Sequence, residues 1–434
     1  GTGRITALDM KKMSEKKAML VFGALGSGKS VSLVKTEIMQ AALRGSSMIV
    51  VDPKDDCFTD MYDFLKRKGM NVSVLNFKDP EYSNAWNCLE ETLDHATGML
   101  DPTKLARFVD IYVKNVNAVK ENHRDFWTDG AKAVMSAFIG VHAFRRETFM
   151  IQAVKEALKT LLLENGRADE WKRLTEDTAD KDGVIIRKLL PDDHALTVNG
   201  MKDLFRKYAG QCGMGYRDAE DVIRKIEDKA PPFSLAAVYY EVLSLNTSKL
   251  KKLREYVVGE EDESGRNRGG MIPFHNPAYA SFLTWDVPGV ADSVKSSTLQ
   301  NLLLNLSVFA DEKLRRMLGN NEINLWEFTS KPSACFIIID KNGPTKPITS
   351  LFFSFVCNDC GDLWDETDAY CRSIGSNPLD LGFLRPLSMI CDEFLSIGMI
   401  PDLADFLSKA RSMHLDMMMD LQNLGQLKEL YGED

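Results

Sequence analysis

The sequence lacks the features of a membrane-spanning, secreted or broadly basic protein. No window approaches the roughly 18 consecutive apolar residues that a membrane helix needs, and the start of the chain has no signal sequence. Basic charge is also limited, because 54 lysines and arginines face 63 acids and leave a net charge of −9. We therefore expect the chain as given to be soluble and cytosolic in character. Any contact with nucleic acid would need a local basic patch or an oligomer channel.

Cysteine is present without the arrangement of a disulfide framework. The eight cysteines are irregularly spaced and lie mostly in apolar runs, which is typical of reduced core cysteines. One pair, Cys357-x-x-Cys360, has metal-type spacing, but no second CxxC or CxxH accompanies it. We therefore assign no zinc site.

The most informative motif is Gly23-Ala-Leu-Gly-Ser-Gly-Lys29-Ser30, which follows the apolar run Ala18–Phe22 and precedes a helix-compatible segment. This is the strand, loop and helix setting that a G-x-x-x-x-G-K-[ST] phosphate loop requires. Lys29 can reach the β and γ phosphate oxygens, and Ser30 can ligate Mg²⁺. The residues predicted to bind nucleotide are Gly23, Gly26, Ser27, Gly28, Lys29 and Ser30. The motif predicts a site for a nucleoside triphosphate with Mg²⁺.

The chain alternates between strand and helix patterns at both ends and is helical in between. Short apolar runs of the kind found in a parallel sheet occur at Ala18–Phe22, Met48–Val51, Asn71–Leu75, Ala334–Asp340, Leu387–Asp392 and Leu415–Asp420. From about residue 89 to about residue 318 nearly every segment has helical periodicity, including Phe126–Phe144, Ile151–Leu163 and Thr298–Leu318. The polar stretch Gly259–Gly270 is predicted to be an exposed loop.

We therefore predict an α/β fold in which one domain is interrupted by another. Residues 1–88 and 319–434 would form a P-loop nucleotide-binding domain, and residues 89–318 would form an all-α domain inserted into it. The first residue is not methionine and the chain stops after a turn-like Tyr431-Gly432, so we expect a fragment of a longer protein.

Two acids follow the apolar run that begins at Pro386, and they are the candidates for metal binding and catalysis. In open α/β sheets, ligands bind at the carboxyl ends of the strands. Asp392 is the expected Mg²⁺ partner of Ser30, and Glu393 is placed to polarise the attacking water as a general base. The alternative is a strand followed by an ordinary acidic helix start.

Two further residues have a functional and a structural interpretation, and both interpretations stay open. Arg411 could project toward the γ-phosphate of a neighbouring subunit as an arginine finger, or it could complement the dipole of a helix end. Gln422, just past a predicted strand, could contact the γ-phosphate or orient water, although a glutamine at such a junction usually does neither.

Taken in order, these segments resemble the coupling-protein ATPases of type IV secretion and conjugation, the TraG/TraD-like family related to the FtsK and HerA translocases. The resemblance rests on several separate stretches. They are Gly23–Ser30, Ile49–Lys54, Ser83–Leu89, Phe126-Trp127 with Ala131 and Ala133, Met389–Gly398, Ile400–Leu403, Ala410–Ser412, Leu421–Leu427 and Tyr431-Gly432. The last third is the most specific, because a phosphate loop and an acid pair alone would fit many ATPases. The helical insertion matches in position and character more than in sequence.

The resemblance implies a RecA-like domain with a helical insertion, assembled as a homo-hexamer that hydrolyses ATP between subunits. It implies anchorage at the cytoplasmic face of the membrane by amino-terminal helices absent here, and delivery of a relaxase–DNA complex or of effector proteins to a secretion channel. In this frame Arg411 matches an inter-subunit arginine and Gln422 a strand-end glutamine. Asp52 and Lys54 also match a family motif, although Asp52 could equally serve structure.

The sequence departs from the family pattern within one strand, and two rival functions remain. Asp416 and Asp420 are unusual in a strand expected to be buried between the phosphate-loop strand and the Asp392 strand, and burial would oblige them to have partners. One rival is a DNA translocase of the FtsK/HerA type, disfavoured by the acidic charge and the large insertion. The other is a non-motor, ATP-binding cargo adaptor, disfavoured by the intact Lys29, Asp392 and Glu393.

Overall fold

A computed structural model of the chain divides into two compact units. The α/β unit comprises Gly1–Cys88, Asp110–Arg124 and Ser307–Asp434, and the helical unit comprises Leu89–Val109 and Asp125–Leu306. The structure describes residues 18–23, 28–117, 126–179, 185–188, 190, 196–261, 267–286, 290–339, 343–376, 378–379, 382, 384–401, 403–410 and 412–432. None of the helices in these ranges combines the length and apolarity that a bilayer crossing requires.

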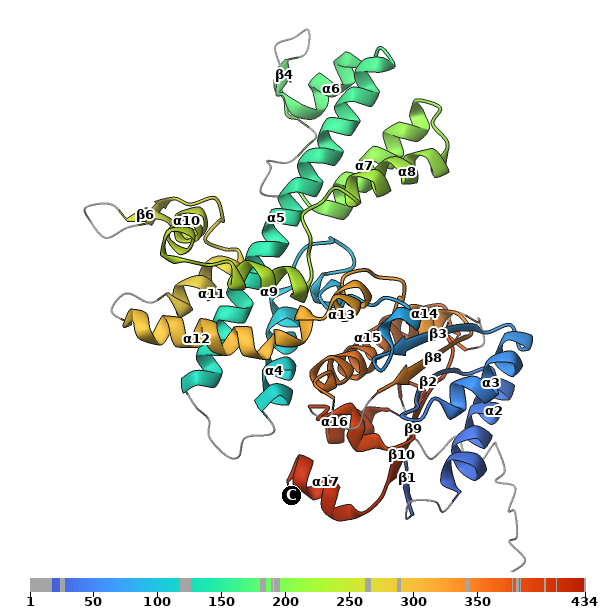
Figure 1. The fold of residues 1–434 in the computed structure, drawn as a ribbon. Helices are drawn as coiled ribbons and strands as arrows, with labels where there is room; N and C mark the ends of the chain where they lie inside the picture. Colours follow the sequence, from blue (N-terminus) through green and yellow to red (C-terminus); the bar gives the residue numbers. More distant parts are fainter. Residues whose placement is uncertain are drawn as a thin grey trace, which may run out of the picture. The chain divides into compact units, whose positions relative to one another are not determined.

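Six parallel strands form the sheet of the α/β unit, in the order β1-β10-β9-β2-β8-β3 (Figure 1). They are β1 (Ala18–Phe22), β2 (Ser47–Val51), β3 (Asn71–Asn76), β8 (Ser333–Ile338), β9 (Leu387–Cys391) and β10 (Leu415–Leu421). Because every neighbouring pair is parallel, the carboxyl ends of all the strands meet at one edge of the sheet. Strand β10 lies between β1 and β9, as expected from the sequence.

The central strands are apolar on both faces because helices cover both sides of the sheet. Every residue of β2, β8 and β9 is buried, whereas β1 at the edge is largely exposed. Helices α2 (Lys35–Arg44) and α3 (Asp56–Arg67) pack on one face against Met48, Phe336 and Ile390. Figure 1 shows α15 (Lys346–Ser373) on the opposite side.

The remaining helical segments of the α/β unit are short. They are η1 (Ser30–Val34), η2 (Pro80–Tyr82), η5 (Ser307–Ala310), α13 (Glu312–Met317), α14 (Glu327–Ser330), η6 (Phe394–Ile397), α16 (Leu403–Lys409) and α17 (Leu424–Tyr431). Segment η1 is a π-helical turn that leads directly into α2, so the helix after the phosphate loop begins with a widened turn.

The helical unit is built around α5 (Phe126–Glu164), a single helix of 39 residues. Helices α7, α11 and α12 pack against it. The other elements, with their bounds, are η3 (Glu90–Thr92), α6 (Ala168–Thr175), α7 (Val198–Gln211), α8 (Tyr216–Glu227), α9 (Leu235–Leu243), α10 (Thr247–Val258), α11 (Pro277–Trp285), α12 (Asp292–Asn305) and the short strands β4 (Thr178–Ala179), β5 (Ile185–Ile186), β6 (Gly259–Glu261) and β7 (Asn267–Gly269). Helix α4 (Pro102–Asn117) has residues in both units. The predicted α/β fold with a long helical region is confirmed.

Three element predictions were wrong in detail. The separate helices Phe126–Phe144 and Ile151–Leu163 are one helix, because the polar residues between them do not end it: Arg145 pairs with Glu241, and the Glu147 carboxylate accepts from the Leu100 amide at 2.6 Å.

The other two concern a hairpin and a helix break. The predicted loop Gly259–Gly270 contains the antiparallel pair β6 and β7, with Glu260 opposite Arg268. The predicted helix Thr298–Leu318 is broken, because Asp311 caps a new helix by accepting from the amides of Lys313 and Leu314 at 2.8 and 3.0 Å.

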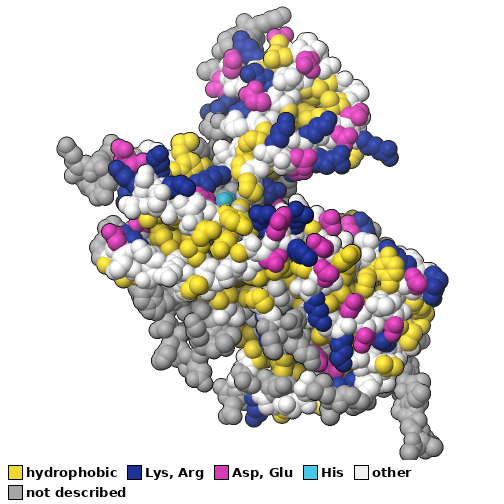
Figure 2. Space-filling model, viewed as in Figure 1, with side chains coloured by type: hydrophobic (Ala, Val, Ile, Leu, Met, Phe, Trp, Pro, Cys, Tyr) yellow, Lys and Arg dark blue, Asp and Glu magenta, His cyan; other side chains and the backbone are white. Residues whose placement is uncertain are grey.

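Charged side chains of both signs are interspersed on the molecular face shown in Figure 2. Hydrophobic side chains lie between them and form patches of limited size on that face. This mixing of both signs agrees with the modest net charge of −9.

A buried asparagine holds together three segments of the α/β unit. The Nδ2 atom of Asn115, in the last turn of α4, lies 3.0 Å from Ser350 Oγ and 3.0 Å from the Met399 carbonyl oxygen. Its Oδ1 accepts from the Met399 amide at 2.8 Å. Gly398 has a φ of 97°, and a Cβ at that position would lie 2.7 Å from Asn115 Oδ1. Both the backbone conformation and the close approach therefore require glycine.

We expect Asn115→Ala to destabilise the α/β unit by about 2–3 kcal/mol, since it leaves the partly buried Met399 amide without its acceptor. Thermal unfolding followed by calorimetry measures the change. Asn165→Ala is the matched control, because Asn165, just past the end of α5, makes a single side-chain hydrogen bond, to the Leu161 carbonyl. Equal shifts of the unfolding transition in the two variants would contradict a special role for Asn115.

Candidate functional site

The candidate residues gather at the carboxyl edge of four adjacent strands. The phosphate loop follows β1, Gln422 follows β10, Asp392 and Glu393 follow β9, and Asp52 follows β2. These strands are neighbours in the order β1-β10-β9-β2, so residues separated by almost four hundred positions in the sequence meet at one place. This edge is where open parallel sheets bind ligands.

The structure describes the two ends of the phosphate loop, Gly23 and the residues from Gly28 onward. Gly28 has a φ of 82°, a left-handed conformation that glycine adopts without strain. Its carbonyl oxygen accepts from the Ser32 amide at 2.9 Å and the Ser32 hydroxyl at 2.7 Å, which fixes the start of the following helix. Gly23 lies directly after β1. The predicted loop residues Gly26 and Ser27 lie outside the described residues.

The ammonium group of Lys29 is held at the ends of β1 and β10. Its Nζ donates to the carbonyl oxygen of Gly23, lies 3.4 Å from the Leu421 carbonyl oxygen and forms an ion pair with Asp420 at 2.7 Å. The side chain of Lys29 is 15% exposed and that of Asp420 is 3% exposed, so this ion pair is largely shielded from water. The lysine thus lies inside the site.

Ser30 and Asp392, the two residues predicted to hold the metal, are in direct contact. The Ser30 hydroxyl donates to Asp392 Oδ2 at 2.8 Å. Burial raises the pKa of the Asp392 carboxyl, the hydrogen bond from Ser30 lowers it, and the nearby negative charge of Asp420 raises it again. A hydroxyl and a carboxylate are oxygen ligands of the kind that Mg²⁺ prefers, and a buried acid beside a second acid favours a cation. The residues present therefore fit Mg²⁺.

Asp52 caps the helix that follows it. Its Oδ2 accepts from the amides of Cys57 and Phe58, both at 2.8 Å, at the start of α3. Burial raises the pKa of this carboxyl, and the two amide bonds act in the opposite direction. Of the two roles that the sequence left open for Asp52, these contacts support the structural one.

Glu393 occupies a left-handed backbone conformation immediately after Asp392. Its φ and ψ are 68° and 67°. Its carbonyl oxygen accepts hydrogen bonds from the amide and the hydroxyl of Ser396, and these bonds close the short turn η6 that follows Glu393. Strand β9 ends at Cys391, so the two acids lie beyond it and need not alternate across the sheet. A non-glycine residue in this conformation costs about 1 kcal/mol or more and is often found at functional sites.

Of the two remaining candidates, the structure places one. Gln422 directly follows Leu421 and is half-buried, next to Gly23, whose amide lies 3.4 Å from the Leu421 carbonyl oxygen. Arg411 lies outside the described residues.

Two residues of this region were not among the predicted site residues. Asp420 stood out in the sequence only as an acid that would need a partner, and the structure supplies Lys29. Asn115 carried no signal, because an asparagine near a helix end is usually a capping residue. It fixes Met399, in the segment that follows Glu393. That segment is also held by Thr349, whose hydroxyl donates to the Ile397 carbonyl at 2.7 Å, and by Tyr431, whose hydroxyl accepts from the Ile400 amide at 3.0 Å.

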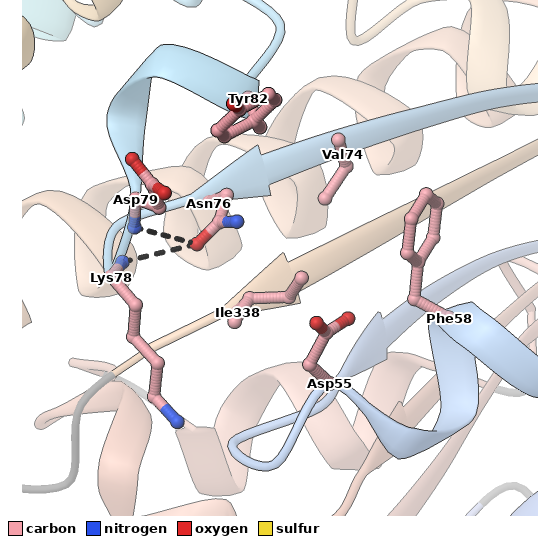
Figure 3. Close-up of a pocket in the computed structure, with 8 residues that line it drawn as sticks. All are labelled: Asp55, Phe58, Val74, Asn76, Lys78, Asp79, Tyr82 and Ile338. Atoms are coloured by element: carbon pink, nitrogen blue, oxygen red, sulfur yellow. Dashed lines mark hydrogen bonds between the residues drawn. The ribbon is translucent and has the colours of Figure 1, made fainter.

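A separate cavity of about 320 Å³ lies near the carboxyl ends of β3 and β8 (Figure 3). Its lining residues are Asp55, Phe58, Val74, Asn76, Lys78, Asp79, Tyr82 and Ile338. Asn76 Oδ1 accepts from the amides of Lys78 and Asp79 at 3.1 and 3.0 Å, and these bonds shape the turn after β3. None of the lining residues belongs to the phosphate loop or to the acid pair, so the cavity is distinct from the candidate site.

Two family models match parts of this chain. Residues 4–180 match the family described as type IV secretory system conjugative DNA transfer, and residues 386–434 match the family described as the TraM recognition site of TraD and TraG. The two matches contain the phosphate loop and the acid pair respectively. No curated protein matches the chain.

Solved structures share the fold. The bacterial conjugative coupling protein TrwB, in a trigonal form in complex with sulphate, has a TM-score of 0.52 and 16% sequence identity, over 100% of this chain and 69% of that one. The plasmid coupling protein TrwB in complex with ADP and Mg²⁺ has a TM-score of 0.51 and 17% identity, over 98% of this chain and 68% of that one.

At these identities the structural likeness speaks for the fold, and the two sequence matches speak for the family. The phosphate loop after β1 and the acid pair after β9 lie within those matches and meet at one edge of a TrwB-like sheet. The chain belongs to the conjugative DNA-transfer coupling protein family of type IV secretion, the family of TraG, TraD and TrwB.

Proposed function

We propose that this protein is a Mg²⁺-dependent ATP hydrolase that acts as the coupling protein of a type IV secretion or conjugation system. The observation that carries the proposal is the contact between the phosphate-loop serine and the strand-end acid, Ser30 with Asp392 at 2.8 Å, beside the enclosed ammonium of Lys29. A hydroxyl, a carboxylate and a lysine in this arrangement match the needs of a metal-bound triphosphate.

Each residue has a defined part in the proposed reaction. Lys29 would bind the β and γ phosphate oxygens, and Ser30 with Asp392 would hold Mg²⁺, which neutralises charge on those oxygens. Glu393 would accept a proton from the water that attacks the γ-phosphorus, and Gln422 would orient that water or contact the γ-phosphate. Arg411 would reach the nucleotide of a neighbouring subunit, which makes hydrolysis dependent on assembly.

The cargo and partners follow from the family. A chain of this family would recruit a relaxase–DNA complex or effector proteins and pass them to channel components, as a homo-hexamer at the cytoplasmic face of the membrane. The match of residues 386–434 to the TraM recognition site of TraD and TraG supports a TraM-like accessory protein as one partner. In our proposal residues 1–88 and 319–434 form the nucleotide-binding domain, and the all-α domain of residues 89–318 offers the cargo surface. DNA would be contacted through local patches.

The roles of Lys29 and Glu393 predict two different defects. Lys29→Ala should abolish nucleotide binding, because the phosphates lose their cation. Glu393→Gln should keep ATP binding and lower turnover by about 100-fold to 10,000-fold, since only the proton acceptor is lost. Calorimetric ATP titration and a phosphate-release assay measure the two quantities. Lys35→Ala is the control, because Lys35 pairs with Asp60 on the next helix. Normal hydrolysis by the Glu393 variant would exclude it as the base.

If Arg411 acts on the nucleotide of a neighbouring subunit, its removal should lower the rate of ATP hydrolysis only in assembled protein. We expect wild-type turnover to rise steeply with protein concentration or with single-stranded DNA, together with a hexamer-sized species in light scattering. Arg411→Ala should lower that turnover and leave the basal rate of the monomer unchanged. The same loss in a monomeric preparation would argue against action across subunits. Negligible turnover by a wild-type hexamer that binds ATP would instead favour a non-motor adaptor.

A further inference from the structure

Asp420 is an acid in a position that the sheet otherwise fills with apolar side chains. It lies near the end of β10, opposite Val21 of β1, and follows Met417, Met418 and Met419, all of which are buried. The residue itself is 2% exposed. A carboxylate in such a place is costly unless a cation or several hydrogen bonds compensate it.

The compensation comes from the phosphate-loop lysine. Asp420 Oδ1 lies 2.7 Å from Lys29 Nζ. The negative charge of the same carboxylate raises the pKa of Asp392, because the two acids lie close together at the buried ends of β10 and β9. Lys29 is therefore engaged on three sides by Asp420 and by the carbonyl oxygens of Gly23 and Leu421. Phosphate oxygens must compete with these partners for the ammonium group.

We propose that Asp420 is a positioning residue that holds Lys29 within the site before nucleotide binds and makes nucleotide binding more dependent on Mg²⁺. This inference rests on the proposed function. It adds that Asp420 makes nucleotide bind more readily once Mg²⁺ is present. When Lys29 moves to a phosphate, Asp420 is left buried beside Asp392 with no cation. A divalent cation at Ser30 and Asp392 restores the balance of charge next to both carboxylates.

The variant that tests this is Asp420→Asn, which keeps the shape of the side chain and removes its charge. Without Mg²⁺, we expect the variant to bind ADP about tenfold more tightly than the wild type, because Lys29 no longer leaves an anionic partner. The gain in ADP affinity on adding Mg²⁺ should be correspondingly smaller in the variant. Calorimetric titration of ADP in EDTA and in MgCl₂ measures both.

Asp416→Asn is the matched control, because it removes the same charge from the other end of the same strand. The Asp416 variant should bind ADP with wild-type affinity both with and without Mg²⁺. A merely structural role for Asp420 would weaken ADP binding equally with and without Mg²⁺, and that result would overturn the inference. Equal affinities in wild type and Asp420→Asn under both conditions would overturn it as well.

A double-mutant cycle in thermal unfolding tests the ion pair without any nucleotide. Lys29→Gln and Asp420→Asn should each shift the midpoint temperature of unfolding. The shift in the double variant should be smaller than the sum of the two single shifts, because both single changes remove the same interaction. Strict additivity would refute the proposal. A wild-type protein that binds no ADP would refute the proposed function, while this cycle would still decide whether Asp420 holds Lys29.

Discussion

The site depends on one constraint, the parallel direction of four neighbouring strands. Because β1, β10, β9 and β2 all run the same way, their carboxyl ends meet at one edge and bring Lys29, Asp392 and Asp420 within reach of one another. A parallel sheet needs long connections between its strands. The longest connection here contains the helical unit, whose main helix α5 alone has 39 residues. In the sequence this insertion lies between β3 and β8, which pair directly with one another in the sheet.

The central strands and the phosphate loop could be predicted from the sequence because their physical signals are local. A strand buried on both faces is a short apolar run, and β2, β8 and β9 lie within two residues of their predicted limits. The contact of Ser30 with Asp392 could be anticipated for the same reason, since a phosphate loop and a strand ending in acids each define a place at the edge of the sheet.

Structural roles that depend on a partner distant in the sequence could not be predicted. Residues 145–150 look like a break between two helices, yet Arg145 and Glu147 find partners on other segments of the helical unit and α5 continues. Asn115 shows its role only when Met399 is beside it, more than 280 residues later. Asp420 was recognised as an acid in need of a partner, but the identity of that partner depends on the side chain of Lys29 folding back along β10.

The conformation of Glu393 has a consequence for how this protein can change. A left-handed backbone is strained for glutamate and relaxed for glycine, so the position is occupied by a residue that the fold alone would not favour. Stability alone would favour glycine at this position, whereas the role of general base that we propose for Glu393 requires the acid. In our proposal the turn after β9 is thus a point of trade-off between stability and ATP hydrolysis.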